Sequence, residues 1–578
     1  SQPDVGSGPF TSLGHNVVGI EEGMTNFVHN VLGDQVGTLA EPLDPHITDL
    51  ADWGGPTKTH ALLAASPAID AGENGELSED QRGAERVLDG GGLVDSVADA
   101  GAFEFGTFFV YDTTDSVDAE IGDGLAVDID GRHTLRAAVQ EANATSGRSI
   151  VVVAPGRYSL TIPGRDEDDA STGDLDIRSP LTLAGAGRGD TVIDAQGIDR
   201  GIHVLSTDLD ISDLQITGGQ YDNSAGGGIQ SQGNLVLRRV DLTDNSSAFG
   251  GAIYAVGTDS LIRIENSSLV GNRSNQRGGG IYADGSRIEI LDSRIEGNIG
   301  SDAGGGVYIG NGAFGSLPSF IQGTRIAQNQ SANGGGIFFA DQQRGLTITE
   351  TSFEANTAIG SGGGTFAAGG AQPVQFQSSL FANNISLMSP GGGFYSSSGI
   401  IEFTNTTVSG NRSEQAAGGG VAAMSGSQVT LSSTTLTGNI GTTSGGLLID
   451  QGGIVTLANS LIARNVSTSG SSGDVLVSSG QIESSGGNLI GDGVQGTFVP
   501  ATGDLVGSST TPLDPLLGPL QDNGGPTWTH ALRTGSPAID AGLSTQAATD
   551  ARGLARALDG NDDGTDLPDI GAYEFEFG

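Results

Sequence analysis

Residues 278–300 read GGGIYADGSRIEILDSRIEGNIG, and this stretch contains the features that decide the fold. Three glycines precede a short apolar run, which is followed by the alternating segment Arg287-Ile288-Glu289-Ile290 and then by Asn298. The same order of features recurs about every 27 residues. Because apolar and polar residues alternate with period two, the segment predicts strands with one buried face.

The recurrence can be followed at two positions of the repeat. The last residue of each glycine triplet falls at Gly228, Ala252, Gly280, Gly306, Gly336, Gly364, Gly393, Gly420 and Gly446. The asparagine falls at Asn245, Asn272, Asn298, Asn329, Asn356, Asn384, Asn411, Asn439 and Asn465. Spacings of 24 to 31 residues indicate stacked coils with turns of variable length rather than a heptad or a helical-hairpin repeat.

One such coil can bury its apolar face only against the coils above and below it. We therefore predict an all-β fold, a parallel β-helix over residues 145 to 510, with coils about 4.8 Å apart. Asparagine tolerates a left-handed turn, and its amide can bond to the equivalent amide one coil away, so we expect a buried asparagine ladder. A buried ladder would hide its N-x-Ser/Thr sequons from glycosylation.

The composition excludes several classes of protein. The chain has 578 residues, 97 of them glycine, a net charge of -44 and no cysteine. A strongly negative field repels phosphate, so we expect no nucleic-acid partner. Without cysteine there is no disulfide framework and no thiol nucleophile. No apolar run reaches the length of a membrane span and no signal peptide opens at Ser1, so the chain reads as a mature or excised segment.

A second, longer repeat relates the two ends of the chain. Residues 56–62 (PTKTHAL) match residues 526–532 (PTWTHAL), and SPAIDAG at 66–72 recurs at 536–542, both 470 residues apart. Asp80, Arg82, Gly83, Arg86 and Asp89 return as Asp550, Arg552, Gly553, Arg556 and Asp559. We therefore predict tandem modules of about 470 residues. Residues 1–106 would be the C-terminal end and cap of a preceding module, 107–150 an N-terminal capping segment, 151–510 the β-helix, and 511–578 a C-terminal cap or connector.

Two motifs carry a family resemblance. The DNGGPTWTHAL block at 522–532 and the SPAIDAG blocks resemble the choice-of-anchor Q family, found at the C-terminal ends of β-helix proteins. TLRAAVQEAN at 134–143 resembles the CSLREA segment that opens such helices, with Thr and Ala in place of its Cys and Glu. The resemblance implies a right-handed β-helix on an exported bacterial or archaeal surface protein, secreted or held at the cell surface, and it implies no reaction.

The TLRAAVQEAN segment also has a physical interpretation. It predicts a short amphipathic helix with Leu135, Ala138, Val139 and Ala142 on one face. Such a helix would cover the open N-terminal edge of the β-helix, which a solenoid must protect.

The residues give little support for catalysis. Polysaccharide lyases and hydrolases also use parallel β-helices, so the fold alone cannot decide. The acidic residues of the coils form no conspicuous cluster, and we interpret Arg263, Arg273, Arg287 and Arg294 as outward, solvated side chains. His60 and His530 occupy equivalent Thr-His-Ala-Leu contexts, which favours packed, hydrogen-bonded histidines. We predict no catalytic residues and keep a polysaccharide lyase or hydrolase as the alternative.

Metal binding is the best chemical candidate. The DGNDDGT stretch places Asp559, Asn561, Asp563 and Thr565 with the spacing of calcium ligands, although Ile570 stands where a bidentate Glu is expected. The first copy has only DGGG at 89–92. We therefore keep two interpretations of the 559–565 loop, a calcium site and a solvated acidic turn, with the acidic runs 112–130 and 166–176 as less specific cation collectors.

These features together predict a structural function. We expect a stalk, sheath or extracellular filament built from copies of the chain joined head to tail, because a head-to-tail contact that does not close a ring propagates into a filament. An adhesin that binds glycans is an alternative.

Overall fold

The structure is a computed structural model that describes residues 4, 12–21, 32–51, 53, 56–63, 66–75, 77–86, 97–257, 260–310, 317–340, 344–471, 473–544 and 547–576. The chain divides into two compact units, residues 1–217 with 233–235, and residues 218–232 with 236–578. The fold is all-β, with 2% helix, and is a parallel β-solenoid of about 11 turns. Among the described residues, no helix has the length and apolarity needed to cross a bilayer.

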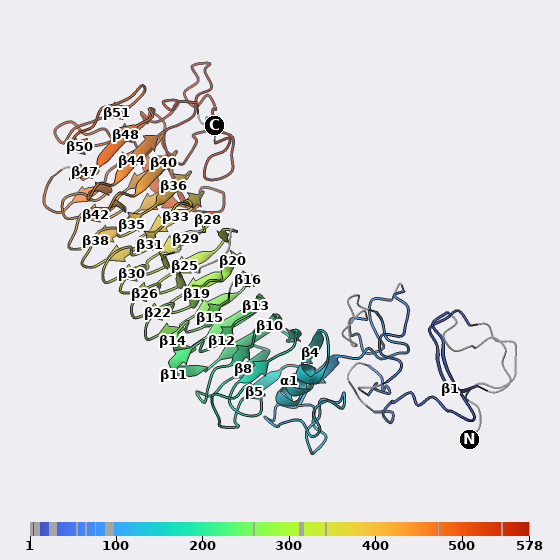
Figure 1. Ribbon diagram of the computed structural model, residues 1–578. Coiled ribbons are helices and arrows are strands. Elements are labelled where there is room, and N and C mark those ends of the chain that lie inside the picture. The colour runs from blue at the N-terminus through green and yellow to red at the C-terminus, as the bar shows by residue number, and fades with distance from the viewer. Residues whose placement is uncertain are drawn as a thin grey trace. The chain divides into compact units, whose positions relative to one another are not determined.

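One coil of the second unit illustrates how the sequence builds the stack. It consists of β19 (Ile281–Asp284), β20 (Arg287–Leu291), β21 (Arg294–Glu296) and β22 (Ile299–Gly300). In β20, Ile288 and Ile290 are fully buried, while the alternating residues Arg287, Glu289 and Leu291 face outward. The coil pairs in parallel with the next one, β19 with β23 (Val307–Ile309) and β21 with β25 (Arg325–Ala327). Figure 1 shows the strands of successive coils following one another along the stack, and the predicted parallel β-helix is confirmed.

The predicted asparagine ladder is confirmed as well. The Asn298 side chain accepts both the backbone N–H and the Nδ2–H of Asn272 on one Oδ1 atom, at 2.9 and 3.0 Å. Asn298 in turn donates its own pair to Asn329, and the pattern repeats from Asn245 to Asn465. Every rung is buried, so the ladder hides the sequons that it contains.

The glycine triplets bring consecutive coils into close contact. Gly278 has a φ of 67°, which a side chain would strain, and a Cβ at Gly280 would lie 2.6 Å from the Gly306 carbonyl oxygen. Glycine is therefore required both for the turn and for the close packing of the next coil.

The predicted helix is present as α1 (Leu135–Ala144), begun by Thr134, whose side chain accepts the Ala137 N–H. Residues 135–142 are all buried, whereas the sequence predicted only one buried face. The difference arises because Arg136 donates to the carbonyls of Ala170, Gly173 and Asp174 and binds the Asp115 carboxylate, so polar positions are enclosed too. Residues 107–150 also contain β3 (Thr107–Val110), which pairs with β4 (Ser149–Val153).

The described parts of the two copies of the long repeat share several contacts. We call residues 1–106 the N-terminal block and residues 471–576 the C-terminal block. In the N-terminal block, the Asp99 N–H donates to Glu104 and the Phe105 N–H donates to Asp99. In the C-terminal block, the Asp569 N–H donates to Glu574 and the Phe575 N–H donates to Asp569. Both blocks also contain a parallel strand pair, β1 (Val17–Glu21) with β2 (Gln35–Thr38), and β49 (Leu489–Ile490) with β51 (Leu505–Val506). The repeated residues therefore form the framework of the block.

The C-terminal segment reaches further than a cap at the end of the stack. Residues of 511–578 contact coils as far back as Ser378, whose carbonyl accepts the Thr527 hydroxyl. The segment therefore lies against the side of several coils, because its polar side chains find partners in the turns of those coils.

Replacing a rung of the ladder should destabilise the stack. In Asn356→Ala, the buried N–H and Nδ2–H of Asn329 lose their shared acceptor and the Ile326 carbonyl loses its donor. We expect a loss of about 3 kcal/mol in the free energy of unfolding, measured by urea denaturation. The exposed Asn275→Ala should change it by less than about 0.5 kcal/mol. Equal stability of the two variants would contradict a ladder that stabilises the stack.

Candidate functional site

The first unit contains a cluster of possible metal ligands on two neighbouring coils. Asp176 lies on β6 (Leu175–Ile177) and His203 on β9 (Ile202–Val204), and the two residues are directly paired across these parallel strands. Asp168 comes from the loop that joins β5 (Gly156–Ser159) to β6. Because equivalent residues of adjacent coils stack, the strand pairing itself brings the imidazole beside the carboxylate.

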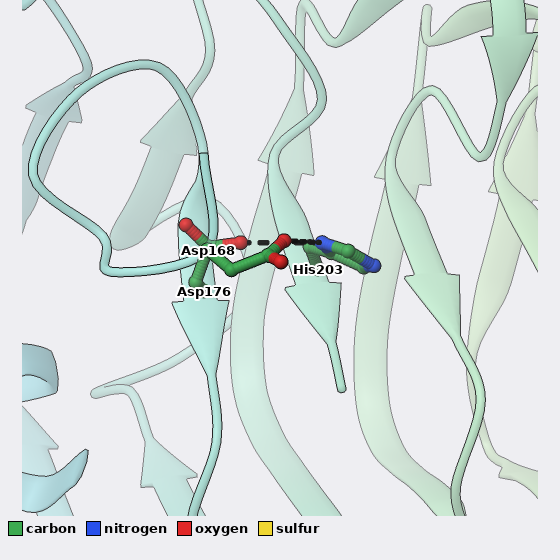
Figure 2. Close-up of side chains that lie close together, drawn as sticks. All are labelled: Asp168, Asp176 and His203. Atoms are coloured by element: carbon green, nitrogen blue, oxygen red, sulfur yellow. Dashed lines mark hydrogen bonds and ion pairs between the residues drawn. The ribbon is translucent and has the colours of Figure 1, made fainter. Parts of the chain in front are cut away.

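The three side chains converge on one another, as Figure 2 shows. His203 Nδ1 lies 3.2 Å from an Asp176 carboxylate oxygen and 3.7 Å from an Asp168 carboxylate oxygen. One ligand atom of each residue lies within 4.8 Å of the other two. Asp176 and His203 are buried and Asp168 is exposed, so solvent reaches the cluster from the Asp168 side.

The surrounding loop fixes the two buried ligands. The second oxygen of Asp176 accepts the Ala170 N–H at 2.9 Å, which orients the carboxylate. The pKa of Asp176 lies above its usual value, because burial raises it more than the hydrogen bond with His203 lowers it. His203 Nε2 is buried and has no hydrogen-bond partner among the described residues. Both carboxylates therefore lie on the Nδ1 side of the imidazole.

This arrangement fits a divalent cation that accepts nitrogen and oxygen ligands. Ligands about 2.1 Å from a tetrahedral ion lie roughly 3.4 Å apart, and the distances of 3.2 and 3.7 Å bracket that value. Zinc and the neighbouring transition metals accept imidazole and carboxylate, and three protein ligands leave a position for water. Without an ion, His203 Nδ1 lies at hydrogen-bond distance from the Asp176 carboxylate.

Sequence reasoning found part of this cluster. The acidic run 166–176 was predicted to collect cations, and both aspartates lie in it. His203 was missed, although it follows Asp176 by 27 residues, the same spacing as the coil repeat. The coil period was therefore the signal that could have placed the histidine next to the run.

Residues 561–565 of the predicted calcium loop are exposed, and side chains of the loop accept hydrogen bonds from the loop's own backbone. Asp559 accepts the N–H groups of Asp563 and Gly564 at 3.0 and 2.8 Å, and Asn561 accepts that of Asp563. The Asp563 carboxylate accepts the Thr565 N–H at 2.9 Å. Several of the predicted ligand oxygens are thus engaged with the loop backbone, and calcium there stays a prediction. The corresponding stretch of the first copy, residues 89–92, lies outside the described residues.

Arg263, Arg273, Arg287 and Arg294 reach the surface, as the sequence predicted. Arg263 pairs with Glu265 and Glu289, Arg287 with Glu289, and Arg294 with Glu296. Three of these arginines thus form ion pairs with glutamates of their own coil or of a neighbouring coil.

A second pair of acids ends the asparagine ladder. Asp474 occupies the next rung and accepts the N–H and Nδ2–H of Asn465 at 3.1 and 2.9 Å. Its second oxygen accepts the Asp492 N–H, and burial together with the Asp492 charge raises the pKa of Asp474 to about 7. The pair lines a cleft of about 410 Å³ that also contains Arg464 and Asp514.

Comparisons with known proteins agree with the fold. The family model for the right-handed β-helix region matches residues 335–504 and so indicates that the parallel β-helix is right-handed. A search of curated proteins found no significant match.

Solved structures with some likeness include two Azotobacter vinelandii mannuronan C-5 epimerase A-modules. That of AlgE4 has 13% identity and a TM-score of 0.34 over 66% of this chain and 97% of its own. That of AlgE6 has 17% identity and a TM-score of 0.29 over 66% and 95%. Pectate lyase Pel9A has 13% identity and a TM-score of 0.32 over 85% and 99%. Likeness at this level says nothing about activity.

The metal prediction can be tested on the full chain. Titration with Zn²⁺ or Co²⁺ at high salt, followed by calorimetry or by Co²⁺ absorption, should show one specific site. His203→Ala should weaken that site at least about tenfold, since it removes the nitrogen ligand. His46→Asn, which changes an exposed histidine, should leave it unchanged. Equal binding by the His203 variant would contradict a metal site at these three residues.

Buried carboxyls should make stability fall between pH 4 and pH 8. Burial raises the pKa values of Asp99, Glu141, Asp474 and Asp569 to about 7, compared with about 4 in the unfolded chain. Their contribution is complete below pH 4 and is lost as the pH rises through about 7, because the native site disfavours the charged form. We expect Tm at constant ionic strength to be higher at pH 5.5 than at pH 8, by at least about 5 °C. Asp492→Asn should reduce the difference, and a Tm that rises with pH over this range would contradict it.

Proposed function

We propose that the chain is a structural, tandem-module protein of an exported bacterial or archaeal stalk, sheath or extracellular filament, with modules joined end to end. One observation carries this proposal. The described parts of residues 1–106 and 471–576 have matching hydrogen bonds and a parallel strand pair each, and one β-helix lies between them in the sequence. If each block follows one β-helix and precedes the next, the modules form a linear array.

The character of the stack supports a mechanical function. The buried amide ladder contains nine asparagines, one from each of nine consecutive coils, and it connects every coil of that region to its neighbour. The net charge of -44 would keep parallel stacks apart and leave their ends as the attractive surfaces. The choice-of-anchor Q and CSLREA resemblances support a secreted or cell-surface location, and calcium at Asp559–Thr565 would assist assembly.

A polysaccharide lyase, hydrolase or glycan-binding adhesin is the second candidate. The cleft of about 410 Å³ favours it, because Asp474 has a pKa near neutrality and Arg464 lies in the same wall. Incubation with acidic polysaccharides and calcium would release unsaturated or reducing oligosaccharides if this candidate were correct. Saturable binding without release would indicate an adhesin.

Electron microscopy tests the structural proposal directly. Native material, with and without calcium, should contain filaments with an axial repeat of one module, which exceeds about 50 Å for about 11 turns. Discrete monomers at every protein and calcium concentration would contradict end-to-end association.

A further inference from the structure

We infer that the N-terminal block carries a preformed docking face for the side and end of a parallel β-helix of this same repeat. The face consists of Ile47, His60, Arg86, Gly101 and the edge of β1 that pairs with no described strand. The inference rests on the tandem arrangement proposed above, and it names the surface through which one module would hold the next.

The C-terminal block shows what such a face binds. His530 Nε2 lies 2.9 Å from the Ser409 hydroxyl, and because Nδ1 faces the Gly518 carbonyl, Nε2 accepts that hydroxyl hydrogen. Arg556 donates to the Asn405 side-chain oxygen at 2.8 Å. Ser409 and Asn405 belong to coils of the β-helix, which we call the acceptor coils, residues 378–465.

The same face also has apolar and backbone contacts with the acceptor coils. Leu517 is only 4% exposed and belongs to a buried cluster that includes Leu461 and Ala463. The N–H groups of Leu489 and Gly491 donate to the Ser460 and Ile462 carbonyls, which adds β49 to the stack as its next strand. The Gly571 N–H donates to the Asn459 carbonyl at 2.8 Å.

The N-terminal block has the same side chains in the same internal positions. His60 Nδ1 lies 2.7 Å from the Thr48 carbonyl, as His530 Nδ1 lies 2.8 Å from that of Gly518. Arg86 donates to the carbonyls of Asp99 and Gly101, as Arg556 does to those of Asp569 and Gly571. These groups are thus oriented by the block itself, before any β-helix is bound.

Several of these groups are exposed in the part of the chain that the structure describes. Ile47, the counterpart of Leu517, is 43% exposed, and His60 and Gly101 are exposed, whereas His530 is half-buried and Gly571 is buried. A hollow of about 350 Å³ lies there, lined by Ile47, His60 and Gly101 among others. Among the described strands β1 pairs only with β2, so its other edge presents the N–H groups of Val17 and Gly19, the counterparts of Leu489 and Gly491.

The occupant that fits this face is a set of acceptor coils. They supply a hydroxyl for His60, an amide oxygen for Arg86, leucine and alanine for Ile47, and strand carbonyls for β1, as they do in the C-terminal block. In a second copy of the chain, these groups are already covered by its own C-terminal block. The 470-residue offset places the matching coils ahead of Ser1, so we assign the face to the β-helix of a preceding module.

An extended chain tests this assignment. Residues 107–470 are placed ahead of Ser1, so that residue 470 joins residue 1 as it joins Ser471 in the chain itself. Hydrogen exchange of the peptide covering Val17–Glu21 should be at least about 100-fold slower in the extended chain than in the unextended chain, since the β1 amides gain acceptors. Equal exchange in the two chains would overturn the inference.

Matched variants separate docking from folding. Ile47→Asp should leave the melting temperature of the unextended chain unchanged, because this side chain is exposed there, and should abolish the protection of β1 in the extended chain. Arg86→Ala should reduce the protection. Lys58→Ala should not, because its counterpart Trp528 is 53% exposed. Protection that survives Ile47→Asp would place the contact elsewhere and overturn the assigned face.

The outcome is independent of filament formation. Protected β1 amides without filaments would support the docking face and contradict the proposed filament. Filaments without protection at β1 would support the filament and contradict the face.

Discussion

The whole stack depends on the fact that a single coil cannot satisfy its own interior polar groups. Each ladder asparagine uses one side-chain oxygen to accept two N–H groups of the coil before it, and its own amide donates to a carbonyl of that coil and to the next rung. A buried amide without such partners would cost about 1 to 3 kcal/mol. The coils are therefore obliged to follow one another in register, and the glycine triplets allow the close approach that the register demands.

The end of the ladder shows how the same constraint is met where the repeat stops. Asp474 replaces the next asparagine and accepts the same two donors, but a carboxylate in this position is buried and faces a second acid, Asp492. The last coil is then continued by the C-terminal block, which supplies β51 as a further strand and covers the side of the stack. An acid at a buried rung thus marks the change from repeat to block.

Stacking also produces the candidate metal centre without any local motif. Asp176 and His203 are separated by one coil in the sequence and become neighbours because parallel strands place equivalent residues side by side. The third residue, Asp168, arrives through the loop that Arg136 and Asp176 hold in place. In the two terminal blocks, by contrast, the repeated aspartates and arginines act locally. They bind backbone N–H and carbonyl groups and so replace regular secondary structure.

The sequence by itself determined the parallel β-helix, the buried asparagine ladder, the short helix near residue 135 and the duplication of the terminal block. Each of these follows from periodic residues whose partners lie one coil or one module away, so spacing alone reveals them. The tertiary structure alone decided that Asp168 joins Asp176 and His203, that α1 is enclosed on all sides, and that the C-terminal segment lies along the side of the coils. Those contacts depend on where loops and outward side chains meet in space, and no period in the sequence encodes that.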